Sequence, residues 1–393
     1  MIGVSAAVGV LIAGVSPGLP IPAAAFGQNV AGISSGASAD VELRSLRLWD
    51  TGTRWDQIET APDQYTWDTL GAAVDNARTG GATDVLYVLG STPQWAARDP
   101  QIPGLYGPGT TSLPKDTEDY VDFVREVANR YKGRITAYQI WNEANTRSFY
   151  EGDWTALAKL TRRAHDAIKL IDPSAQVVGA SSTVIPGKLF QTESFFVRYA
   201  RAIHDVGDPV DAMAVHLYPV DTSKGPEARV GSIRAAQRVM NRVGIDRPLW
   251  DTEVNYGDRR DPARQVVPKP KKAATYVSRT YLDSARYNVE RTFWYGWDID
   301  TLGISLSNPD GSPTRAGRAY LNTRDWMLAG SWKGCKTKGK VTTCKVGKTK
   351  ILYASKKKTV KRPSGVTQVC KLTGKCSAAG SKIKVGSAPI RLS

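Results

Sequence analysis

Short apolar runs alternate with segments of helical periodicity along most of the chain. The apolar runs predict buried strands over residues 25–30, 43–50, 84–89, 135–141, 176–180, 211–217, 248–252 and 290–295. Between them, apolar residues recur with the spacing of one helix face, as at Tyr120, Val124 and Val127. This alternation predicts an α/β fold in which helices separate successive parallel strands.

Eight predicted strands, each followed by a helix or its remnant, indicate a (β/α)₈ TIM barrel over residues 26–329. The helix after the first strand is expected to be curtailed, because the chain up to residue 39 is rich in Gly and Ser. Residues 99–114, which are rich in Pro and Gly, are too long for a plain connection. We therefore predict that they form a functional loop at the barrel mouth.

The pattern changes at residue 330. Short β-like runs, separated by turns that contain Lys and Gly, predict a small C-terminal all-β domain of four or five strands over residues 330–393. All cysteines of the chain lie in this domain, and their spacing matches no zinc pattern: Cys335, Cys344, Cys370 and Cys376. An even number indicates disulfides formed in an oxidising compartment. Three pairings are possible, and we favour the local one, 335–344 with 370–376.

The first 25 residues form an apolar run followed by prolines and the small residues Ala23, Ala24 and Ala25. This order is typical of a secretory signal or a similar leader, although no Lys or Arg precedes the apolar run. The run is shorter than a membrane span requires, and no other segment qualifies as one. We expect a secreted or cell-surface protein without a transmembrane span.

The net charge of +16 arises entirely in the C-terminal domain. Residues 331–393 hold 17 of the 53 Lys and Arg and no acidic residue, which leaves 36 basic and 37 acidic residues in the first 330. A basic domain beside a neutral barrel predicts contact with an anionic polysaccharide or the cell envelope. Specific nucleic-acid binding is not expected, because the lysines alternate with small and β-branched residues and not with aromatic residues that stack on bases.

Two of the predicted strands end in a glutamate. Glu143 follows the run ITAYQIW, and Glu253 ends the run PLWDTE 110 residues later. In a TIM barrel the carboxyl ends of the strands meet at one rim, where the chemistry takes place. Two carboxylates at that rim are the groups that acid–base work on one substrate requires.

Five motifs carry a resemblance to a known family: RLWD (47–50), WNEAN (141–145), HLYP (216–219), DTEVNYG (251–257) and FWYGWD (293–298). With them the chain resembles the retaining glycoside hydrolases of clan A. It is most similar to family 39 and its relatives, which include β-xylosidases, α-L-iduronidases and bacterial exopolysaccharide glycosidases. The resemblance spans residues 26–329. It departs from the family at NEAN, where many members have NEPN, in the curtailed first helix and in the Lys-rich tail.

The resemblance implies a role for each matching residue. Glu143 corresponds to the acid/base and Glu253 to the nucleophile, and Asn142 would hydrogen-bond the sugar 2-hydroxyl. Arg47 and Tyr218 would touch Glu253 and keep it ionised, since a cation or a hydrogen-bond donor lowers the pKa of a carboxyl group.

Three further residues are candidates for substrate contact. His216 would line the floor of the same site, and Trp95 and Trp297 are candidate platforms for sugar rings. No cofactor is implied. A transition-metal site is not expected either, because the chain has only three His and its barrel has no Cys.

The prediction is a secreted retaining β-glycosidase that cleaves O-glycosidic bonds of a polysaccharide or oligosaccharide by double displacement. The alternative is a non-catalytic polysaccharide-binding or cell-surface protein attached through its basic tail. Such a protein would be expected to have lost the glutamate pair, and this chain keeps both Glu143 and Glu253.

Overall fold

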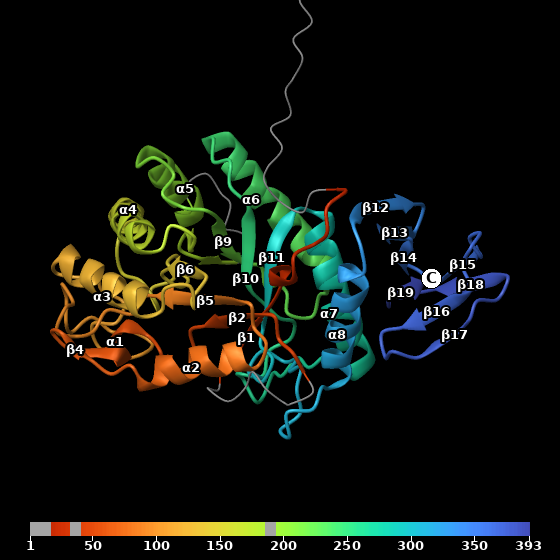
Figure 1. Cartoon of the computed structure of the whole chain (residues 1–393), viewed down its shortest axis with the longest axis horizontal. Coiled ribbons are helices and arrows are strands. Elements are labelled where there is room, and N and C mark those ends of the chain that lie inside the picture. The colour runs from red at the N-terminus through yellow and green to blue at the C-terminus, as the bar shows by residue number, and fades with distance from the viewer. Residues whose placement is uncertain (1–16, 32–40, 185–193) are drawn as a thin grey trace, which may run out of the picture.

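The computed structural model describes residues 17–31, 41–184 and 194–393. It contains a barrel of strands surrounded by helices, and a group of strands that lies beside helices α7 (Pro270–Arg286) and α8 (Arg315–Leu328) (Figure 1). Most of the predicted leader, and the Gly- and Ser-rich stretch at 32–39, lie outside the described residues.

One sheet of parallel strands forms the barrel, in the order β7-β6-β5-β2-β1-β11-β10-β9-β8. Its strands are β1 (Phe26–Asn29), β2 (Ser45–Leu48), β5 (Asp84–Leu89), β6 (Ala137–Ile140), β7 (Gln176–Val178), β8 (Ser182–Thr183), β9 (Met213–His216), β10 (Leu249–Val254) and β11 (Val289–Tyr295). Strands β7 and β8 are two parts of one barrel strand, because β7 pairs with β6, β8 pairs with β9, and Val178 bridges to Ala212 between them. The sheet therefore closes on itself, which confirms the predicted TIM barrel.

The other barrel elements cover the outside of this sheet or connect its strands. They are α1 (Trp55–Ile58), the hairpin β3 (Glu59–Ala61) and β4 (Gln64–Tyr65), α2 (Asp68–Thr79), α3 (Thr117–Arg130), α4 (Trp154–Ile171), α5 (Phe195–Asp205) and α6 (Arg229–Val243), with 3-10 turns at Ala23–Ala25 and Pro226–Ala228. Helix α4 shows why the sequence pattern predicts such elements. Asp153 accepts hydrogen bonds from the first free backbone amides, and Leu157, Ala164 and Ile168 bury one face. The helix ends directly before Asp172-Pro173, because proline disfavours helical backbone in the residue before it.

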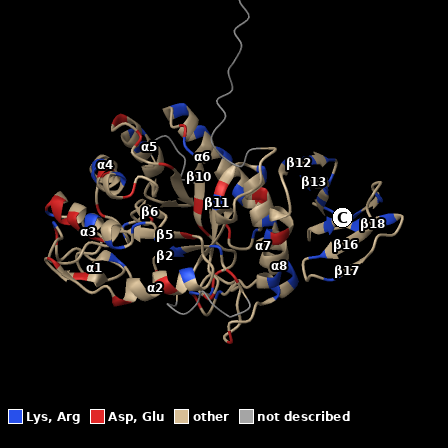
Figure 2. Cartoon of the chain, viewed as in Figure 1, with Lys and Arg blue, Asp and Glu red and all other residues tan. Residues whose placement is uncertain are grey.

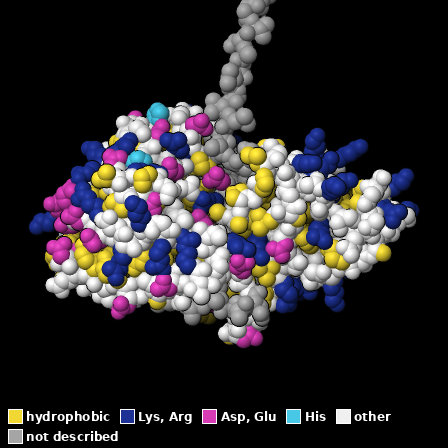
Figure 3. Space-filling model, viewed as in Figure 1, with side chains coloured by type: hydrophobic (Ala, Val, Ile, Leu, Met, Phe, Trp, Pro, Cys, Tyr) yellow, Lys and Arg dark blue, Asp and Glu magenta, His cyan; other side chains and the backbone are white. Residues whose placement is uncertain are grey.

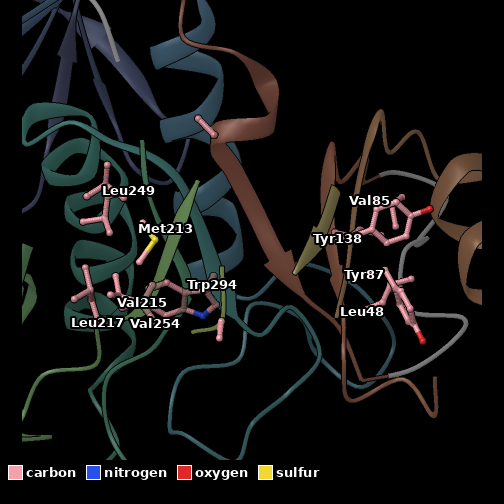
Figure 4. Close-up of a cluster of buried hydrophobic side chains, with 14 of the residues drawn as sticks. Leu48, Val85, Tyr87, Tyr138, Met213, Val215, Leu217, Leu249, Val254 and Trp294 are labelled. Atoms are coloured by element: carbon pink, nitrogen blue, oxygen red, sulfur yellow. The ribbon is translucent and has the colours of Figure 1, made fainter. Parts of the chain in front are cut away.

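Two apolar layers hold the barrel together. The inner layer fills the barrel itself and consists of Leu86, Ala137, Val178, Ala212, Ala214, Trp250 and Phe293. The outer layer packs the opposite side of the strands against the helices, and Figure 4 shows part of it, including Val85, Tyr87 and Met213. Successive residues of a strand face opposite sides, so Leu86 lies inside while Val85 and Tyr87 lie outside. Gly27 is required where the Phe293 ring crosses β1, since a Cβ there would lie 2.3 Å from the ring.

The C-terminal domain has more strands than the four or five predicted. They are β12 (Trp332–Lys338), β13 (Val341–Val346), β14 (Thr349–Ala354), β15 (Lys358–Lys361), β16 (Gln368–Lys371), β17 (Cys376–Ala378), β18 (Lys382–Val385) and β19 (Ile390–Leu392). Six of them form one sheet, while β15 and β18 form a separate ribbon. The apolar pattern missed strands such as β15 and β17 because most of their residues are exposed.

Both favoured disulfide pairings are confirmed. Cys335 and Cys344 lie opposite each other on β12 and β13, and Cys370 and Cys376 do so on β16 and β17. Each bridge therefore joins two adjacent antiparallel strands. A domain of this size buries few apolar side chains, so the bridges supply part of its stability.

Hydrogen bonds attach the C-terminal domain to the barrel. The Tyr353 hydroxyl donates to Asp283 of α7 at 2.7 Å, and Arg286 donates to the Thr337 hydroxyl at 2.8 Å. The chain before the barrel joins the same contact, because the Trp332 amide donates to the carbonyl of Leu19 at 2.8 Å. The domain limits at residues 25 and 329 stay predictions.

Charge is distributed unevenly over these parts. In Figure 2 basic and acidic residues mix over the barrel helices, whereas all charged residues of the C-terminal domain are basic. No helix among the described residues has the length and apolar character needed to cross a membrane.

Candidate active site

A cleft of about 850 Å³ opens at the carboxyl ends of the barrel strands. Its floor holds Asn142, Glu143 and Glu253, so the structure brings the two predicted glutamates to one site. Leu105 and Tyr106 reach the cleft from the long 99–114 segment, in agreement with a loop at the barrel mouth. We therefore take this cleft as the candidate active site.

Glu253 is held from two sides near the end of β10. The Arg47 guanidinium donates to Oε1 at 2.6 Å, and the Tyr218 hydroxyl donates to Oε2 at 2.7 Å. A register shift in the pairing of β10 with β9, between Asp251 and Glu253, places Glu253 opposite His216. Both carboxylate oxygens thus have a donor before any substrate is present.

Arg47 is fully buried and connects several strands. Besides Glu253, its guanidinium donates to Asn29 at 2.9 Å, to Gln139 at 3.1 Å and to the side-chain oxygen of Asn142 at 2.7 Å. The last of these bonds fixes the orientation of the Asn142 amide, whose oxygen accepts from Arg47. Arg47 therefore positions two of the predicted site residues at once.

Glu143 follows β6 in an unusual backbone conformation. Its φ is +39°, and Trp141 two residues earlier has φ +71°. Left-handed backbone is uncommon for residues other than glycine and is often found at functional sites. The Glu143 amide donates to the Ser181 hydroxyl at 2.9 Å, which ties this turn to the next barrel strand.

His216 lies between the two carboxyl groups. Its Nδ1 is 2.8 Å from Oε1 of Glu143 and 3.3 Å from Oε2 of Glu253. Burial, opposed by the charge of Glu253 and reinforced by that of Arg47, lowers the pKa of His216 to about 3, so the imidazole is neutral at neutral pH. Among the described residues Nε2 has no hydrogen-bond partner, which assigns the proton of the ring to Nδ1.

The two carboxyl groups differ in their surroundings. Burial raises the pKa of Glu143 to about 7, and a hydrogen bond with Thr183 and the charges of Arg47 and Arg260 offset this rise only in part. Burial also raises the pKa of Glu253, while its neighbours His216 and Arg47 oppose the rise. Glu253 thus lies against a guanidinium that favours its ionised form, but the expectation that Arg47 and Tyr218 lower its pKa overall omitted the effect of burial.

Ligand-capable atoms of Glu143, His216 and Glu253 all lie within 4.8 Å of one another. Such a group has the composition of a metal site, but both oxygens of Glu253 already accept hydrogen bonds from Arg47 and Tyr218. Instead, one of the two carboxyl groups can deliver a proton, while the other, as an anion, has an oxygen within 4.8 Å of it. That is the geometry for acid–base and nucleophilic work on a single small centre.

A family model described as "Glycosyl hydrolase catalytic core" matches residues 81–320, more than half of the chain and a segment that contains both glutamates. The chain belongs to this family. It is a glycoside hydrolase with a carbohydrate as its substrate. A comparison with curated proteins finds no match.

Solved structures of glycoside hydrolases share the fold of the whole chain. A family 39 glycoside hydrolase from the gut symbiont Bacteroides cellulosilyticus WH2 is 16% identical with a TM-score of 0.69, over 89% of this chain and 75% of that one. The GH39 enzyme from Xanthomonas axonopodis pv. citri is 16% identical with a TM-score of 0.68, over 96% and 95%. A monomeric β-xylosidase from Caulobacter crescentus CB15 is 16% identical with a TM-score of 0.67, over 97% of each chain. The resemblance to family 39 noted in the motifs is thus matched by a likeness of fold.

The two predicted sugar platforms do not line the cleft of this glycoside hydrolase. Trp297 is only 2% exposed and packs edge-on against Tyr320 of α8, at 6.2 Å between ring centroids. Trp95 packs against Trp55, and its indole nitrogen donates to the carbonyl of Glu59 at 2.9 Å. Both rings serve the packing of the barrel in this structure, so neither is carried into the proposed function.

Other aromatic residues line the cleft in their place. Trp49, Tyr106 and Phe149 form a cluster with ring centroids 5.8–6.4 Å apart, and all three border the cleft. They come from three separate segments, so no motif connected them. Of the three, Trp49 alone stood within a quoted motif, RLWD.

Asp50 is the second feature that the sequence did not assign. Its carboxylate borders the cleft and accepts hydrogen bonds from Tyr295 at 3.0 Å and from Tyr106 at 3.4 Å. Burial raises its pKa, against the opposing effect of these tyrosines and of Arg47 and Arg54. A carboxyl group in this position can accept a hydrogen bond from a sugar hydroxyl.

Proposed function

We propose that this glycoside hydrolase acts with retention of configuration, with Glu143 as acid/base and Glu253 as nucleophile. The observation that carries the proposal is the closeness of the two carboxyl groups, since one oxygen of Glu143 lies within 4.8 Å of one oxygen of Glu253. Retaining enzymes need about 5–5.5 Å between their carboxyl groups, whereas inverting enzymes need about 6.5–9.5 Å to admit a water. The space between Glu143 and Glu253 supports direct attack on the sugar.

The environments support the assignment of roles. Glu143 has a pKa of about 7 and its side chain is 15% exposed, so it can hold a proton at neutral pH and exchange it in the cleft. Glu253 lies 2.6 Å from a buried guanidinium, which stabilises its anion. The carboxyl group in direct contact with a cation is the better nucleophile, and the one without such a contact is the better acid.

The reaction then proceeds in two displacements. The carboxylate of Glu253 attacks the anomeric carbon while Glu143 gives its proton to the departing glycosidic oxygen. Glu143, now ionised, takes a proton from water, and the hydroxide that forms displaces Glu253 from the sugar and regenerates both groups. Neutral His216, with Nδ1 at 2.8 Å from Glu143, orients that carboxyl group throughout.

The test replaces each glutamate by alanine and supplies an aryl glycoside with an acidic phenol. Glu253→Ala should lose turnover on every substrate, because no covalent intermediate can form. Glu143→Ala should still release the phenol, because this leaving group needs little protonation. Azide, which needs no general base, should then rescue the second step and yield a glycosyl azide with the configuration of the substrate.

The stereochemistry of the azide product, measured by NMR, decides the assignment. Rescue of Glu143→Ala with an inverted product would show that Glu143 is the nucleophile. A rate for Glu253→Ala close to that of the unchanged protein would remove Glu253 from the site.

We also propose that the protein acts outside the cell and that residues 331–393 contact an anionic polysaccharide or the cell envelope. Two disulfides support an oxidising compartment. The 17 positive charges without one acidic residue support an anionic partner. The substrate is a polysaccharide or oligosaccharide with O-glycosidic bonds, and the presence of both glutamates favours an enzyme over a purely binding protein.

A further inference from the structure

A second hollow lies where the barrel meets the C-terminal domain. It encloses about 650 Å³ and is lined on the barrel side by Pro226, Glu227, Lys269, Lys271, Lys272, Thr275, Tyr276 and Arg279, and on the other side by Ala354, Ser355, Ser387 and Ala388. We call it the junction groove. Neither domain makes it alone.

The barrel side of the junction groove carries positive charge that the protein does not neutralise. Lys269, Lys271 and Lys272 are exposed, and none forms a salt bridge within the described part of the chain. Of the other charged lining residues, Arg279 is paired with Asp283 at 2.9 Å. The single acidic residue in the lining is Glu227. Three lysines thus remain to bind an anion from outside.

The first turn of α7 adds to this charge. Lys269 precedes the helix, no acidic residue lies in its first turn, and no side chain caps it. The backbone dipole is positive at this end of a helix, so Asp or Glu is favourable there, as Glu118 is in α3, but α4, α5, α6 and α8 also lack an acidic residue in the first turn. What distinguishes α7 is the three exposed lysines at this end, which the dipole does not favour and which are free to bind an anion.

The other side of the junction groove leads directly into the basic surface of the C-terminal domain. Ser355 is followed in the chain by the exposed run Lys356, Lys357 and Lys358, and Ser387 lies three residues after Lys384. Fifteen of the 17 basic residues of this domain are exposed. On the face shown in Figure 3, dark blue side chains project from the domain with no acidic side chain among them.

Strand pairing in the domain places lysines directly opposite lysines. Lys361 pairs with Lys382 across the β15–β18 ribbon, and Lys345 pairs with Lys350 across β13 and β14. Like charges opposite each other destabilise a sheet. An anionic polymer along this surface would relieve the repulsion, which is a reason independent of the groove to expect such a partner.

We propose that the junction groove binds a segment of an acidic polysaccharide, a sugar chain that bears carboxylates or sulfates, with Lys269, Lys271 and Lys272 as its anion contacts. The assignment rests on the proposed contact between the C-terminal domain and an anionic polymer, and gives that contact a location. Serine hydroxyls in the lining offer contacts suited to sugar hydroxyls. The half-buried Tyr276 ring positions one of the lysines, because the Nζ of Lys272 lies 5.3 Å from the ring centroid.

A nucleic acid fits this surface less well. Both aromatic residues of the C-terminal domain are buried, Trp332 at 1% and Tyr353 at 2% exposure, so they offer no face for stacking with bases.

The junction groove and the active-site cleft lie at the same end of the barrel, because the loop after β10 supplies Gly257 and Arg260 to the cleft and ends in Lys269 at the groove. A polymer held in the groove is therefore held on the side of the molecule where glycosidic bonds are cleaved.

The test compares variants of the full chain that lose the same charge at different places. Binding to polygalacturonate and to heparin is measured by titration calorimetry at 50 mM salt. The groove variant combines Lys269→Gln, Lys271→Gln and Lys272→Gln, and its control changes three exposed barrel lysines instead: Lys115→Gln, Lys132→Gln and Lys159→Gln. A third variant changes the β12–β13 hairpin: Lys336→Gln, Lys338→Gln and Lys340→Gln. Thermal unfolding checks that each variant is folded.

The groove variant should bind at least one of the two polymers about tenfold more weakly, and the barrel control less than about twofold. Binding of the unchanged protein should fall steeply between 50 and 500 mM salt. Because heparin carries both carboxylates and sulfates, loss of binding to heparin alone would identify sulfate as the group that the lysines contact, and loss of binding to polygalacturonate would show that they contact carboxylates.

Other outcomes would overturn the assignment in distinguishable ways. Unchanged affinity in the groove variant, with weaker binding in the hairpin variant, would leave the contact of the C-terminal domain standing and move it away from the groove. Equal losses in all three variants would reduce the effect to net charge. Absence of binding in the unchanged protein would overturn both the contact of the C-terminal domain with an anionic polymer and its location in the groove. Tighter binding of single-stranded oligo(dT) than of either polysaccharide would show that the partner is a nucleic acid.

Discussion

The barrel and the C-terminal domain differ in whether their charged residues have partners of opposite charge. In the barrel, three largely buried arginines each form a salt bridge with a buried carboxylate: Arg47–Glu253, Arg229–Asp251 and Arg291–Asp84. In the C-terminal domain, 17 basic residues face no acidic residue, and two lysine pairs lie directly opposite each other. A charge inside the barrel has its partner within the protein, whereas a charge on the C-terminal domain has none.

This difference separates two uses of electrostatics. A buried charge without a partner is strongly unfavourable, so the barrel compensates these three by salt bridges and others, such as Glu59, by hydrogen bonds. The catalytic pair uses the resulting field. Exposed charges cost little, so the C-terminal domain can accumulate them and leave them free for an external polymer. The four predictions that follow test the contrast, beginning with the largest expected effect.

Replacement of Arg47 by methionine should have the largest effect, because it leaves the Glu253 carboxylate buried without its cation. We expect the free energy of unfolding to fall by about 3–5 kcal/mol and kcat/KM by at least about 10²-fold. Urea denaturation and initial rates measure the two effects. The control is Arg125→Met, whose salt bridges with Glu118 and Asp122 are exposed and should be worth less than about 1 kcal/mol. Similar losses in both variants would contradict the contrast.

Replacement of Glu143 by glutamine should make the folded protein more stable at high pH. In the unchanged protein the pKa of Glu143 rises from 4.5 to about 7 on folding, so the folded state binds the proton of this carboxyl group more tightly than the unfolded state does. The contribution to stability is fully present below pH 4.5 and is lost as the pH rises through 7. Glu143→Gln should therefore match the unchanged protein at pH 4 and exceed it at pH 8 by at most about 3 kcal/mol.

The measurement is the difference in the free energy of unfolding between variant and unchanged protein at the two pH values. The exposed Glu126→Gln serves as control, with a difference expected to stay within about 0.5 kcal/mol. If Glu143→Gln raised the free energy of unfolding equally at pH 4 and pH 8, the effect would not come from the protonation of Glu143. In the unchanged enzyme, the same pKa predicts that kcat/KM for a poor leaving group declines above pH 7.

Removal of one disulfide should weaken the C-terminal domain and leave the barrel intact. The double change Cys370→Ser and Cys376→Ser opens a short loop and should cost about 2 kcal/mol. Hydrogen exchange should increase in β16 and β17, while hydrolysis stays unchanged because the barrel contains no Cys. Labelling of four reactive thiols in the native protein would contradict the presence of both disulfides.

The smallest effect concerns one lysine pair. Lys382→Glu places an opposite charge across from Lys361 and should stabilise the β15–β18 ribbon by about 0.2–1 kcal/mol. Lys384→Glu is the matched control, because it makes the same change in charge opposite Thr359. The difference between the two variants should shrink as salt is added. Equal stability of the two variants at low salt would show that the lysine pair is not under repulsion.

The sequence predicted the barrel best where one signal was strong and continuous. The predicted strand at 84–89 matches β5 (Asp84–Leu89), and the helical spacing of Tyr120, Val124 and Val127 falls within α3 (Thr117–Arg130), which buries all three. The order of apolar and polar residues is enough to predict these elements, because a buried strand is a continuous apolar run and a buried helix face repeats apolar residues with a fixed period. The C-terminal strands were undercounted for the converse reason, since exposed Lys-rich strands have no apolar period.

The candidate site divides in the same way. Motifs at strand ends predicted that Glu143, Glu253, Arg47, Tyr218 and His216 lie near one another, and the structure places them within hydrogen-bond distance of a partner in that group. The prediction was possible because the carboxyl ends of parallel strands meet at one rim whatever the rest of the chain does.

The aromatic lining could not be predicted by the same route. Trp95 and Trp297 stand in motifs next to strand ends, yet their rings pack against Trp55 and Tyr320. Whether such a ring turns toward the cleft or toward the helices depends on the loops that pack on it, and those loops come from distant parts of the chain.

By itself, then, the sequence determined the barrel, the disulfide-bonded basic domain and the strand-end carboxylates, because each of these follows from a local period, a count or a motif. Only the tertiary structure decided that burial raises the pKa of both glutamates, that Asp50 and Tyr106 border the cleft, and that a groove forms between the domains. Burial and shared surfaces arise from contacts between segments far apart in the chain, and no local pattern records them.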